Sequence, residues 1–465
     1  MMTLSLALRN LLRNRRRSLA TLLAMAIGST SILLFGGYST NINYTMQTAY
    51  VQKGGHLQIQ HRDFYLYGSG NPTAYGIADY TKILAAIQND EVLRNMVLVA
   101  TPTLQFGGVA GNYAAGVSRT IIGNGFVAQD INRMRRWNDF GLGKDTPVFA
   151  LEGAPADAAI VGTGVARVLQ LCDALKIDRC PKPEREHKSE GADLPDDIAQ
   201  LSMQETPASS GAAVASPRRI EVLAGNARGA PNVTSLEIIR AEDQGFKELD
   251  EIYVMMHLAK AQQLIYGKSP PKVTSIILQL RHSDQIPAAL VRLAPILAKF
   301  SASQPIAVLD FRTLNPFFVQ TMQLFDTIFG FIFALIGAIV LFTVSNTMNT
   351  AVVERTVEIG TLRAIGLRRA GIRRLFVAEG ALLGLGGAVL GVVLALLLSA
   401  IVNQLDLTWS APGTVESLPL TLRVWGETGM IFGTTFGLIC IAVVSAWWPA
   451  YRAAQLDVVD ALRHV

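Results

Sequence analysis

The residue types that carry most protein chemistry are present in this sequence, but their spacings do not suit catalysis or metal binding. The six histidines are scattered, and no HExxH or CxxC pair occurs among them. Zinc sites draw their ligands from such closely spaced pairs, so the sequence predicts no metal site. No serine lies in a G-x-S-x-G turn. We therefore identify no catalytic residue and expect this chain itself to bind no cofactor.

Two further features bear on phosphate and proton chemistry. The stretch "VGTGVARVLQ" (161–170) half resembles a dinucleotide fingerprint, but Arg167 stands where a third small residue is needed, so we interpret it as a strand-to-helix turn. No G-x-x-x-x-G-K-[ST] loop occurs, which predicts that the chain does not bind ATP in the usual way. Glu379 lies in an apolar run and could serve a proton relay. It stands only about one helical turn inside the run, which favours a role in helix packing or hydrogen bonding.

The elements that would position these residues are membrane helices. Half of the 465 residues are hydrophobic and only 17% are charged, which indicates membrane spans joined to a water-soluble part. A span needs about 20 apolar residues, and four segments qualify, with Trp425, Trp447 and Trp448 as interfacial anchors. The predicted spans are 19–38, 321–346, 372–402 and 426–448. The fold class is thus an α-helical membrane domain of four transmembrane helices, with a large α+β extracytoplasmic domain (39–320) between the first two.

The orientation follows from the arginines, which gather before the first span, between the second and third, and after the fourth. The positive-inside rule places residues 1–18, the loop 347–371 and the tail 449–465 in the cytoplasm, and the short loop 403–425 outside. Leucines at helical spacing among arginines make residues 1–18 an amphipathic helix on the inner membrane face. We expect the first span to be an uncleaved signal anchor. No basic patch is interleaved with aromatics, so nucleic-acid binding is not expected.

The extracytoplasmic segment is predicted to contain both strands and helices. We predict strands at 56–60, 103–111, 273–280 and 305–310, and helices over "TKILAAIQND" and "IPAALVRLAPILAKF". Residues 181–219 are rich in proline, serine and acids, and are predicted to be a mobile insert. Cys172 and Cys180 could form a small-loop disulfide if this segment is outside, or remain two unpaired thiols.

Small residues recur every four positions in the third predicted span. Such spacing lets another helix approach closely. Packing within the chain is the favoured interpretation, and a dimer interface is the alternative. The residues concerned are Gly380, Gly384, Gly387 and Gly391.

The loop between the second and third spans holds a helix-like pattern. Val353, Val357, Leu362 and Ile365 are interleaved with charged residues, and Gly366 is a plausible stop. The loop is long for a simple connection, and the chain has no energy-converting motif of its own. A helix that docks into a partner would supply that energy.

Here the sequence resembles a known family. The block "NTMNTAVVERTVEIGTLRAIGLRRAGIRRLFVAEGALLGLGG" (346–387) closely resembles the FtsX-like permease signature of ABC transporters of the macrolide-exporter (MacB) and lipoprotein-release (LolC/LolE) type. The tail 449–465 resembles the closing pattern of that family, although Val458 stands where proline is common. The stretches 161–171 and 248–265 look like elements of its periplasmic domain.

The resemblance implies a permease of the bacterial inner membrane that works with other chains. Two permease copies, identical or paralogous, would pair with a dimer of P-loop ABC ATPases, which bind ATP and Mg. Because this chain starts at its first membrane element, we expect the ATPase to be a separate polypeptide. The helix between the second and third spans would be the coupling helix in or near the ATPase groove. Its residues are Glu354, Arg355, Glu358, Ile359, Gly360, Leu362, Arg363 and Gly366.

The function implied by the resemblance is mechanotransmission. This non-catalytic subunit would convert ATPase motion into a change in its periplasmic domain, and so extract or export an amphiphile such as a lipoprotein, lipid, peptide or drug. Membrane lipid, and a periplasmic adaptor or lipoprotein acceptor, are further expected partners. The alternative is a signalling module, like FtsX itself, that activates a cell-wall hydrolase. A membrane-anchored enzyme is disfavoured because no catalytic constellation is present.

Overall fold

The computed structural model describes residues 2–13, 15–142, 147–177, 217–226, 229–245, 247–405, 407–409 and 418–457. These residues belong to two compact units. The first comprises 1–46, 317–409 and 418–465, and the second comprises 47–316 with 410–417. Cys172 is buried, but Cys180 lies outside the described residues, so their pairing stays a prediction. The predicted insert 181–219 also lies almost entirely outside them.

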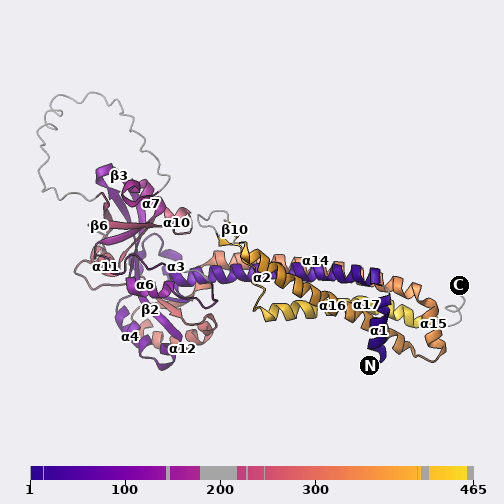
Figure 1. Ribbon diagram of the computed structural model, residues 1–465. Helices are drawn as coiled ribbons and strands as arrows, with labels where there is room; N and C mark the ends of the chain where they lie inside the picture. Colours follow the sequence, from indigo (N-terminus) through magenta and orange to yellow (C-terminus); the bar gives the residue numbers. More distant parts are fainter. Residues whose placement is uncertain are drawn as a thin grey trace, which may run out of the picture. The chain divides into compact units, whose positions relative to one another are not determined.

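The first unit is built from four helices that are long and apolar enough to cross a membrane (Figure 1). They are α2 (Arg15–Gly54), α14 (Pro316–Glu354), α16 (Arg369–Gln404) and α17 (Thr428–Gln455). Each helix extends beyond the apolar stretch from which it was predicted. The predicted amphipathic helix is α1 (Met2–Arg13), and a separate short helix, α15 (Thr356–Ala364), stands between α14 and α16. Strands β10 (Thr408–Trp409) and β11 (Leu418–Pro419) pair between α16 and α17.

The four glycines of α16 contact helices of the same chain. A Cβ on Gly380 or Gly384 would collide with the side chain of Ala446 or Ala442 in α17, while Gly387 and Gly391 meet α2 in the same way. The Thr30 hydroxyl of α2 also donates a hydrogen bond to the Gly391 carbonyl oxygen at 3.1 Å. The described contacts of these glycines thus pack α16 against α2 and α17.

The three tryptophans predicted as interfacial anchors are exposed in the first unit. The Arg373 guanidinium lies 5.2 Å from the ring centre of Trp447, and that of Arg452 lies 5.4 Å from the ring centre of Trp448. Trp425 stands just before α17. Exposed tryptophans beside arginines are typical of the level where a helix meets lipid headgroups.

The second unit is an α+β domain around a mixed nine-stranded sheet, with strand order β3-β7-β4-β6-β5-β2-β8-β1-β9. The long strand β2 joins two lobes, because it pairs with β8 near its start and with β3 and β5 further on. The strands predicted at 56–60, 103–111, 273–280 and 305–310 are confirmed within β1, β2, β8 and β9. The bounds are β1 (Leu57–His61), β2 (Val97–Asn112), β3 (Val117–Phe126), β4 (Ala158–Gly162), β5 (Arg219–Gly225), β6 (Pro231–Glu242), β7 (Tyr253–His257), β8 (Ser275–Leu280) and β9 (Ile306–Asp310).

Short helices surround this sheet and close its core. The two predicted helices are confirmed as α4 (Tyr80–Gln88) and α12 (Ile286–Ser301), and α11 (Leu258–Tyr266) packs on the other lobe. The remaining helices are α3 (Phe64–Tyr67), α5 (Glu91–Met96), α6 (Ala128–Arg135), α7 (Thr163–Val168), α8 (Cys172–Leu175), α10 (Lys247–Asp250) and α13 (Phe311–Leu314), with 3-10 turns at Pro72–Tyr75, Tyr113–Ala115 and Ser283–Gln285.

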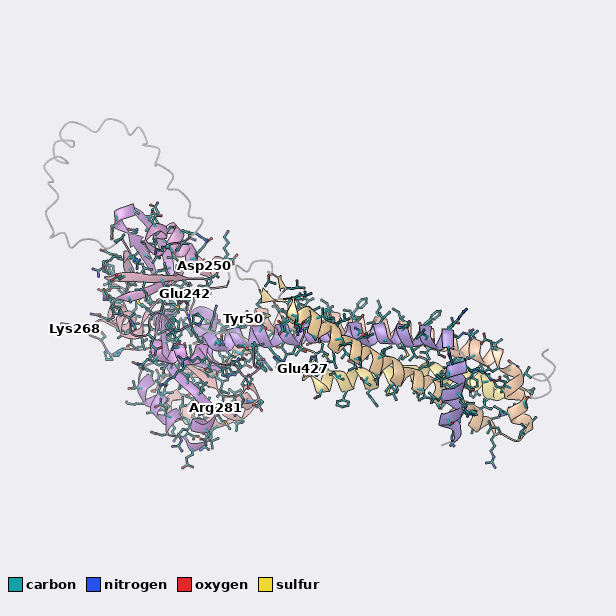
Figure 2. The ribbon with its side chains drawn as sticks, viewed as in Figure 1. Tyr50, Glu242, Asp250, Lys268, Arg281 and Glu427 are labelled. Carbon is teal, nitrogen blue, oxygen red and sulfur yellow. The ribbon has the colours of Figure 1, made fainter. Side chains whose placement is uncertain are left out.

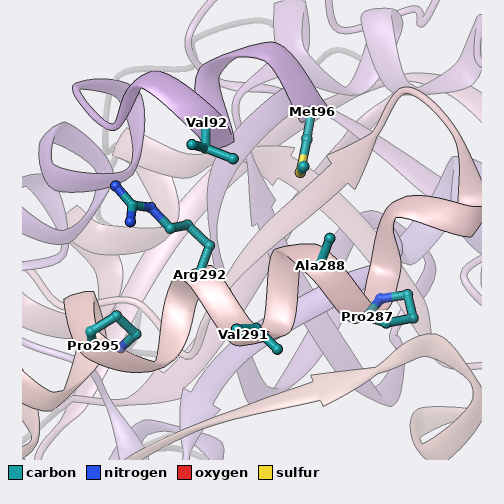
Figure 3. A pocket seen from close by; sticks show the side chains of 7 residues that line it. All are labelled: Val92, Met96, Pro287, Ala288, Val291, Arg292 and Pro295. Atoms are coloured by element: carbon teal, nitrogen blue, oxygen red, sulfur yellow. The ribbon is translucent and has the colours of Figure 1, made fainter.

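A shallow apolar groove runs between α5 and α12 (Figure 3). Val92 and Met96 line one side and Val291 the other. The Arg292 guanidinium reaches across to the Asp90 carboxylate at 2.8 Å. Hydrogen bonds from Arg292 and from the Leu93 amide lower the pKa of Asp90. This ion pair holds the two helices together at the end of the groove.

The stretch that half resembles a dinucleotide fingerprint is a strand-to-helix turn, as predicted, from β4 into α7. The start of α7 is occupied by a carboxylate of the chain itself. Asp250 accepts hydrogen bonds from the Thr163 amide at 2.8 Å and the Gly164 amide at 2.7 Å. Burial raises the pKa of Asp250, and these amides oppose that rise. The place where a phosphate would sit is therefore filled by a side chain.

Candidate functional site: the short helix between α14 and α16

Helix α15 is set apart from its neighbours by a break at each end. Helix α14 stops at Glu354, and Arg355 adopts φ −108° and ψ 17° before α15 begins. At the other end Gly366 has a φ of +104°, which favours glycine. The Gly366 amide donates to the Arg363 carbonyl and the Leu367 amide to the Leu362 carbonyl, each at 3.0 Å. This is a Schellman cap, and it confirms Gly366 as the predicted stop.

Arg355 lies inside the first unit and not on the surface that α15 presents. Its side chain is 8% exposed, and the Glu379 side chain that it meets in α16 is 2% exposed. The Arg355 Nη1 atom donates to Glu379 Oε1 at 3.0 Å and to Oε2 at 3.3 Å. The resemblance had placed Arg355 in or near a partner's groove. A buried guanidinium is stable only with a carboxylate partner, and Glu379 is that partner.

Asn10 of α1 completes this buried cluster. Its Nδ2 atom donates to Glu379 Oε1 at 2.7 Å, and its main-chain oxygen accepts from Arg355 Nη2 at 3.1 Å. The three residues form what we call the buried triad: Asn10, Arg355 and Glu379. It joins α1, the start of α15 and α16 at one point. Glu379 therefore forms hydrogen bonds between helices, as expected from the sequence, and its partners are Asn10 and Arg355.

The two predicted acidic residues of the loop are held by arginines of the N-terminal helices. Arg17 makes a bidentate pair with Glu354, at 2.8 Å from Nη1 to Oε2 and 2.6 Å from Nη2 to Oε1. Arg13 donates to Glu358 at 2.5 Å. Both pairs are partly exposed, so each contributes less than about 1 kcal/mol to stability. Their main effect is to hold α1 and α2 against the start of α15.

The inner side of α15 attaches to the rest of the unit. Ile359 and Gly360 are buried, and Leu362 is partly buried. The Arg363 guanidinium donates to the carbonyl oxygen of Leu456, the residue that follows α17. These predicted residues therefore attach α15 to the rest of the first unit and are not on its exposed face.

Four aliphatic side chains of α15 and its flanks are exposed. Val353 is 69% exposed, Val357 45%, Ile365 79% and Leu367 39%. We call these four residues the outer apolar row. They stand among exposed charged residues, including Arg368 and Arg369, so this level of the helix is not surrounded by apolar side chains alone. Within α15 the usual amphipathic order holds in part, since Ile359 is buried and Glu358 is exposed, but the outer apolar row leaves four aliphatic side chains uncovered.

The sequence did not reveal the partners from the N-terminal helices: Asn10, Arg13 and Arg17. One signal was available, because an acid inside a membrane span requires a polar or basic partner. That rule points from Glu379 to a nearby arginine, but it does not select Arg355 among the arginines of the loop. Within the described ranges, no group of three or more His, Cys, Asp or Glu side chains could hold a metal ion.

The structure has the architecture of a multi-span membrane permease. It has four membrane-type helices, a large α+β domain inserted in the sequence between the first two, and a short helix, α15, between the second and third. Residues 327–458 match the family described as "FtsX-like permease C-terminal". This match includes α15, most of α14, and all of α16 and α17. The chain therefore carries an FtsX-like permease domain.

The curated relatives agree with that assignment. The chain is 29% identical over 157 residues to the lipoprotein-releasing system transmembrane protein LolC of Haemophilus influenzae, covering 34% of this chain and 38% of LolC. It is 34% identical over 143 residues to the macrolide export ATP-binding/permease protein MacB of Escherichia coli O157:H7, covering 31% and 20%. It is 36% identical over 139 residues to the ABC transporter permease YtrF of Bacillus subtilis, covering 29% and 30%. The matches thus span less than two fifths of the length of each of these relatives.

Proposed function

We propose that this chain is the membrane-spanning permease subunit of an ABC transporter and that the outer apolar row docks into a separate ATPase. The single observation that supports this most is the exposure of the outer apolar row. An exposed aliphatic row costs free energy in water, and α15 is too firmly fastened to turn the row inward. A partner surface that covers the row would remove that cost.

The contacts of α15 suggest how motion would pass into the chain. A displacement of the row would move Arg355 and, through the buried triad, α16 and α1 together. The bond from Arg363 would carry the same displacement to the end of α17. We propose that ATP binding and hydrolysis by the partner drive this movement, and that it changes the shape of the α+β domain.

We further propose the orientation and the substrate class that the sequence favours. The arginine-rich ends of the helices would lie in the cytoplasm, and the α+β domain would lie outside the inner membrane. Two copies would pair around the substrate. An acyl chain costs about 0.8 kcal/mol per CH₂ to move into water, so an extracted lipid or lipoprotein would need a shielded apolar path.

The test is affinity purification of the tagged chain in mild detergent, followed by mass spectrometry of co-eluting proteins and lipids. We expect a stoichiometric P-loop ATPase, lost in a Val357→Asp/Ile365→Asp variant because two charges then face the apolar contact. Val291→Asp is the matched control, since Val291 is 77% exposed in the other unit. If the wild-type chain is intact and recovers no ATPase, the docking proposal fails.

The co-eluting molecules also decide between the transport proposal and its alternative. A lipid, lipoprotein or adaptor in the eluate would support extraction or export of an amphiphile. Recovery of a cell-wall hydrolase together with the ATPase would instead favour an FtsX-like signalling module.

A further inference from the structure

The α+β domain contains a cavity that the proposed permease function does not use. Its volume is about 460 Å³, which is within the range of small-molecule sites. The last turn of α2, strand β1, helix α3, helix α6 and strand β7 contribute to its wall. Tyr50, near the end of α2, and Glu242, at the end of β6, mark this region (Figure 2).

Carboxamide side chains are unusually frequent in the wall of this cavity. Four of them donate a hydrogen bond to a main-chain carbonyl oxygen of the domain, at 2.8, 2.9, 3.1 and 2.6 Å: Gln52, Gln58, Gln244 and Asn315. A carboxamide whose NH₂ group is used in this way still has an oxygen with two lone pairs. The second N–H of each NH₂ group is not used in these bonds, so the wall offers both hydrogen-bond acceptors and donors.

Gln60 points to a ligand most directly. It is 4% exposed, and its Nε2 atom donates to Gln58 Oε1 at 2.7 Å. Its own Oε1 atom is buried and has no hydrogen-bond partner among the described residues. A buried acceptor without a partner is costly, and Gln60 lines the cavity. An O–H or N–H group of a bound molecule would satisfy it after a small movement of the Gln60 side chain, because Oε1 exposes less than 1 Å² in this structure.

Both charged side chains that line the cavity, Lys53 and Arg135, already have hydrogen-bond partners in the protein. Arg135 donates to Glu242 at 2.8 Å and stacks on the Phe149 ring at 4.5 Å. Lys53 donates to the Gln244 carbonyl oxygen at 3.0 Å. Because both side chains have partners in the protein, the wall does not require a charged ligand, and a neutral one fits it.

Aromatic rings supply the apolar part of the wall. They come from four elements, α2, α3, β3 and β7, so that a flat molecule would meet more than one ring. The five are Tyr50, Phe64, Tyr65, Phe126 and Tyr253.

We propose that this cavity binds a neutral saccharide of two or three sugar rings. The C–H face of a sugar ring can lie on an aromatic ring, and every hydroxyl can donate to a carboxamide oxygen. A peptide fits less well, because its carbonyl oxygens only accept and its amides only donate, whereas each sugar hydroxyl can use both the oxygen and the remaining N–H of a wall carboxamide. The proposal does not depend on the ATPase or on the transport direction.

The experiment uses the full chain in lipid nanodiscs, with cellotriose as the probe and ligand-observed saturation-transfer NMR to measure binding. We expect saturable binding of cellotriose that weakens about fivefold to tenfold in Gln60→Leu, because one buried hydrogen bond is lost. Tyr65→Ala should weaken it about threefold to tenfold through lost stacking. Gln262→Leu, a carboxamide of α11 outside the cavity, is the matched control and should bind as the wild type does.

Three results would overturn the assignment. The first is the absence of saturable binding of cellotriose to the folded wild-type chain at about 10 mM, a concentration at which even a weak specific site is occupied. The second is binding that neither variant changes, which would place the sugar elsewhere. The third is saturable binding of acetyl-trialanine amide without binding of cellotriose, which would assign the cavity to peptides. Tyr65 is 39% exposed, so Tyr65→Ala keeps the test valid if Gln60→Leu does not fold.

Discussion

Removal of one member of the buried triad should destabilise the first unit far more than removal of an exposed ion pair. The perturbation is Arg355→Leu or Glu379→Leu, each of which leaves the other charge buried without its partner. The two side chains are 8% and 2% exposed, and breaking such a pair costs about 3–5 kcal/mol. The exposed pair Arg13–Glu358 should contribute less than about 1 kcal/mol.

The double variant is the sharper measurement. With Arg355 and Glu379 both replaced by leucine, no charge remains buried, so the loss should be smaller than the sum of the single losses by about 2 kcal/mol or more. Both hydrogen bonds that join Asn10 to the pair would then be lost. The assay is unfolding of the full chain in mixed dodecylmaltoside–SDS micelles, followed by circular dichroism, with an Arg13→Gln/Glu358→Gln cycle as the control. A coupling energy no larger than that of the control cycle would falsify the view that the buried triad is the strongest polar contact between α1, the start of α15 and α16.

Three further predictions concern other parts of the chain. His56 is fully buried, and desolvation lowers its pKa to about 4 from an ordinary value near 6.5. Below about pH 6.5 the unfolded form therefore binds a proton that the folded form does not, and stability should fall by about 2 kcal/mol between pH 6.5 and 5; urea unfolding of the α+β domain at the two pH values should show this, with a smaller difference in His56→Asn. Gly384→Leu should cost about 1–3 kcal/mol, since a Cβ there already lies 2.9 Å from the Ala442 side chain, whereas Gly433→Ala, with open space around it, should leave micelle unfolding unchanged. Gly366→Ala should cost about 1–2 kcal/mol because φ is +104°, and faster hydrogen exchange of the α15 amides, without change in α16, is the measurement that would show it.

Much of the fold could be predicted because it depends on local periodicity. Apolar runs of sufficient length predicted α2, α14, α16 and α17, and alternation predicted β1. The strand order could not be read in this way, because β2 pairs with three strands that lie far apart in the sequence. Asp250 at the start of α7 is a comparable case. The glycines of the sequence predicted the turn, whereas the Asp250 carboxylate that accepts from the Gly164 amide lies 86 residues further along the chain.

The candidate site shows why residue type alone misleads at a helix of this kind. In a helix that covers its own core, charged residues face water and aliphatic residues face inward, and that rule would place Arg355 outside and Val357 inside. Here Glu379 lies within an apolar span and draws Arg355 inward, since an isolated buried carboxylate is more costly than a displaced valine. Arg355 precedes α15, and within α15 Ile359 is buried and Glu358 is exposed, as the rule expects. The exposed outer apolar row is the departure from that rule, and the proposed docking to a partner rests on it.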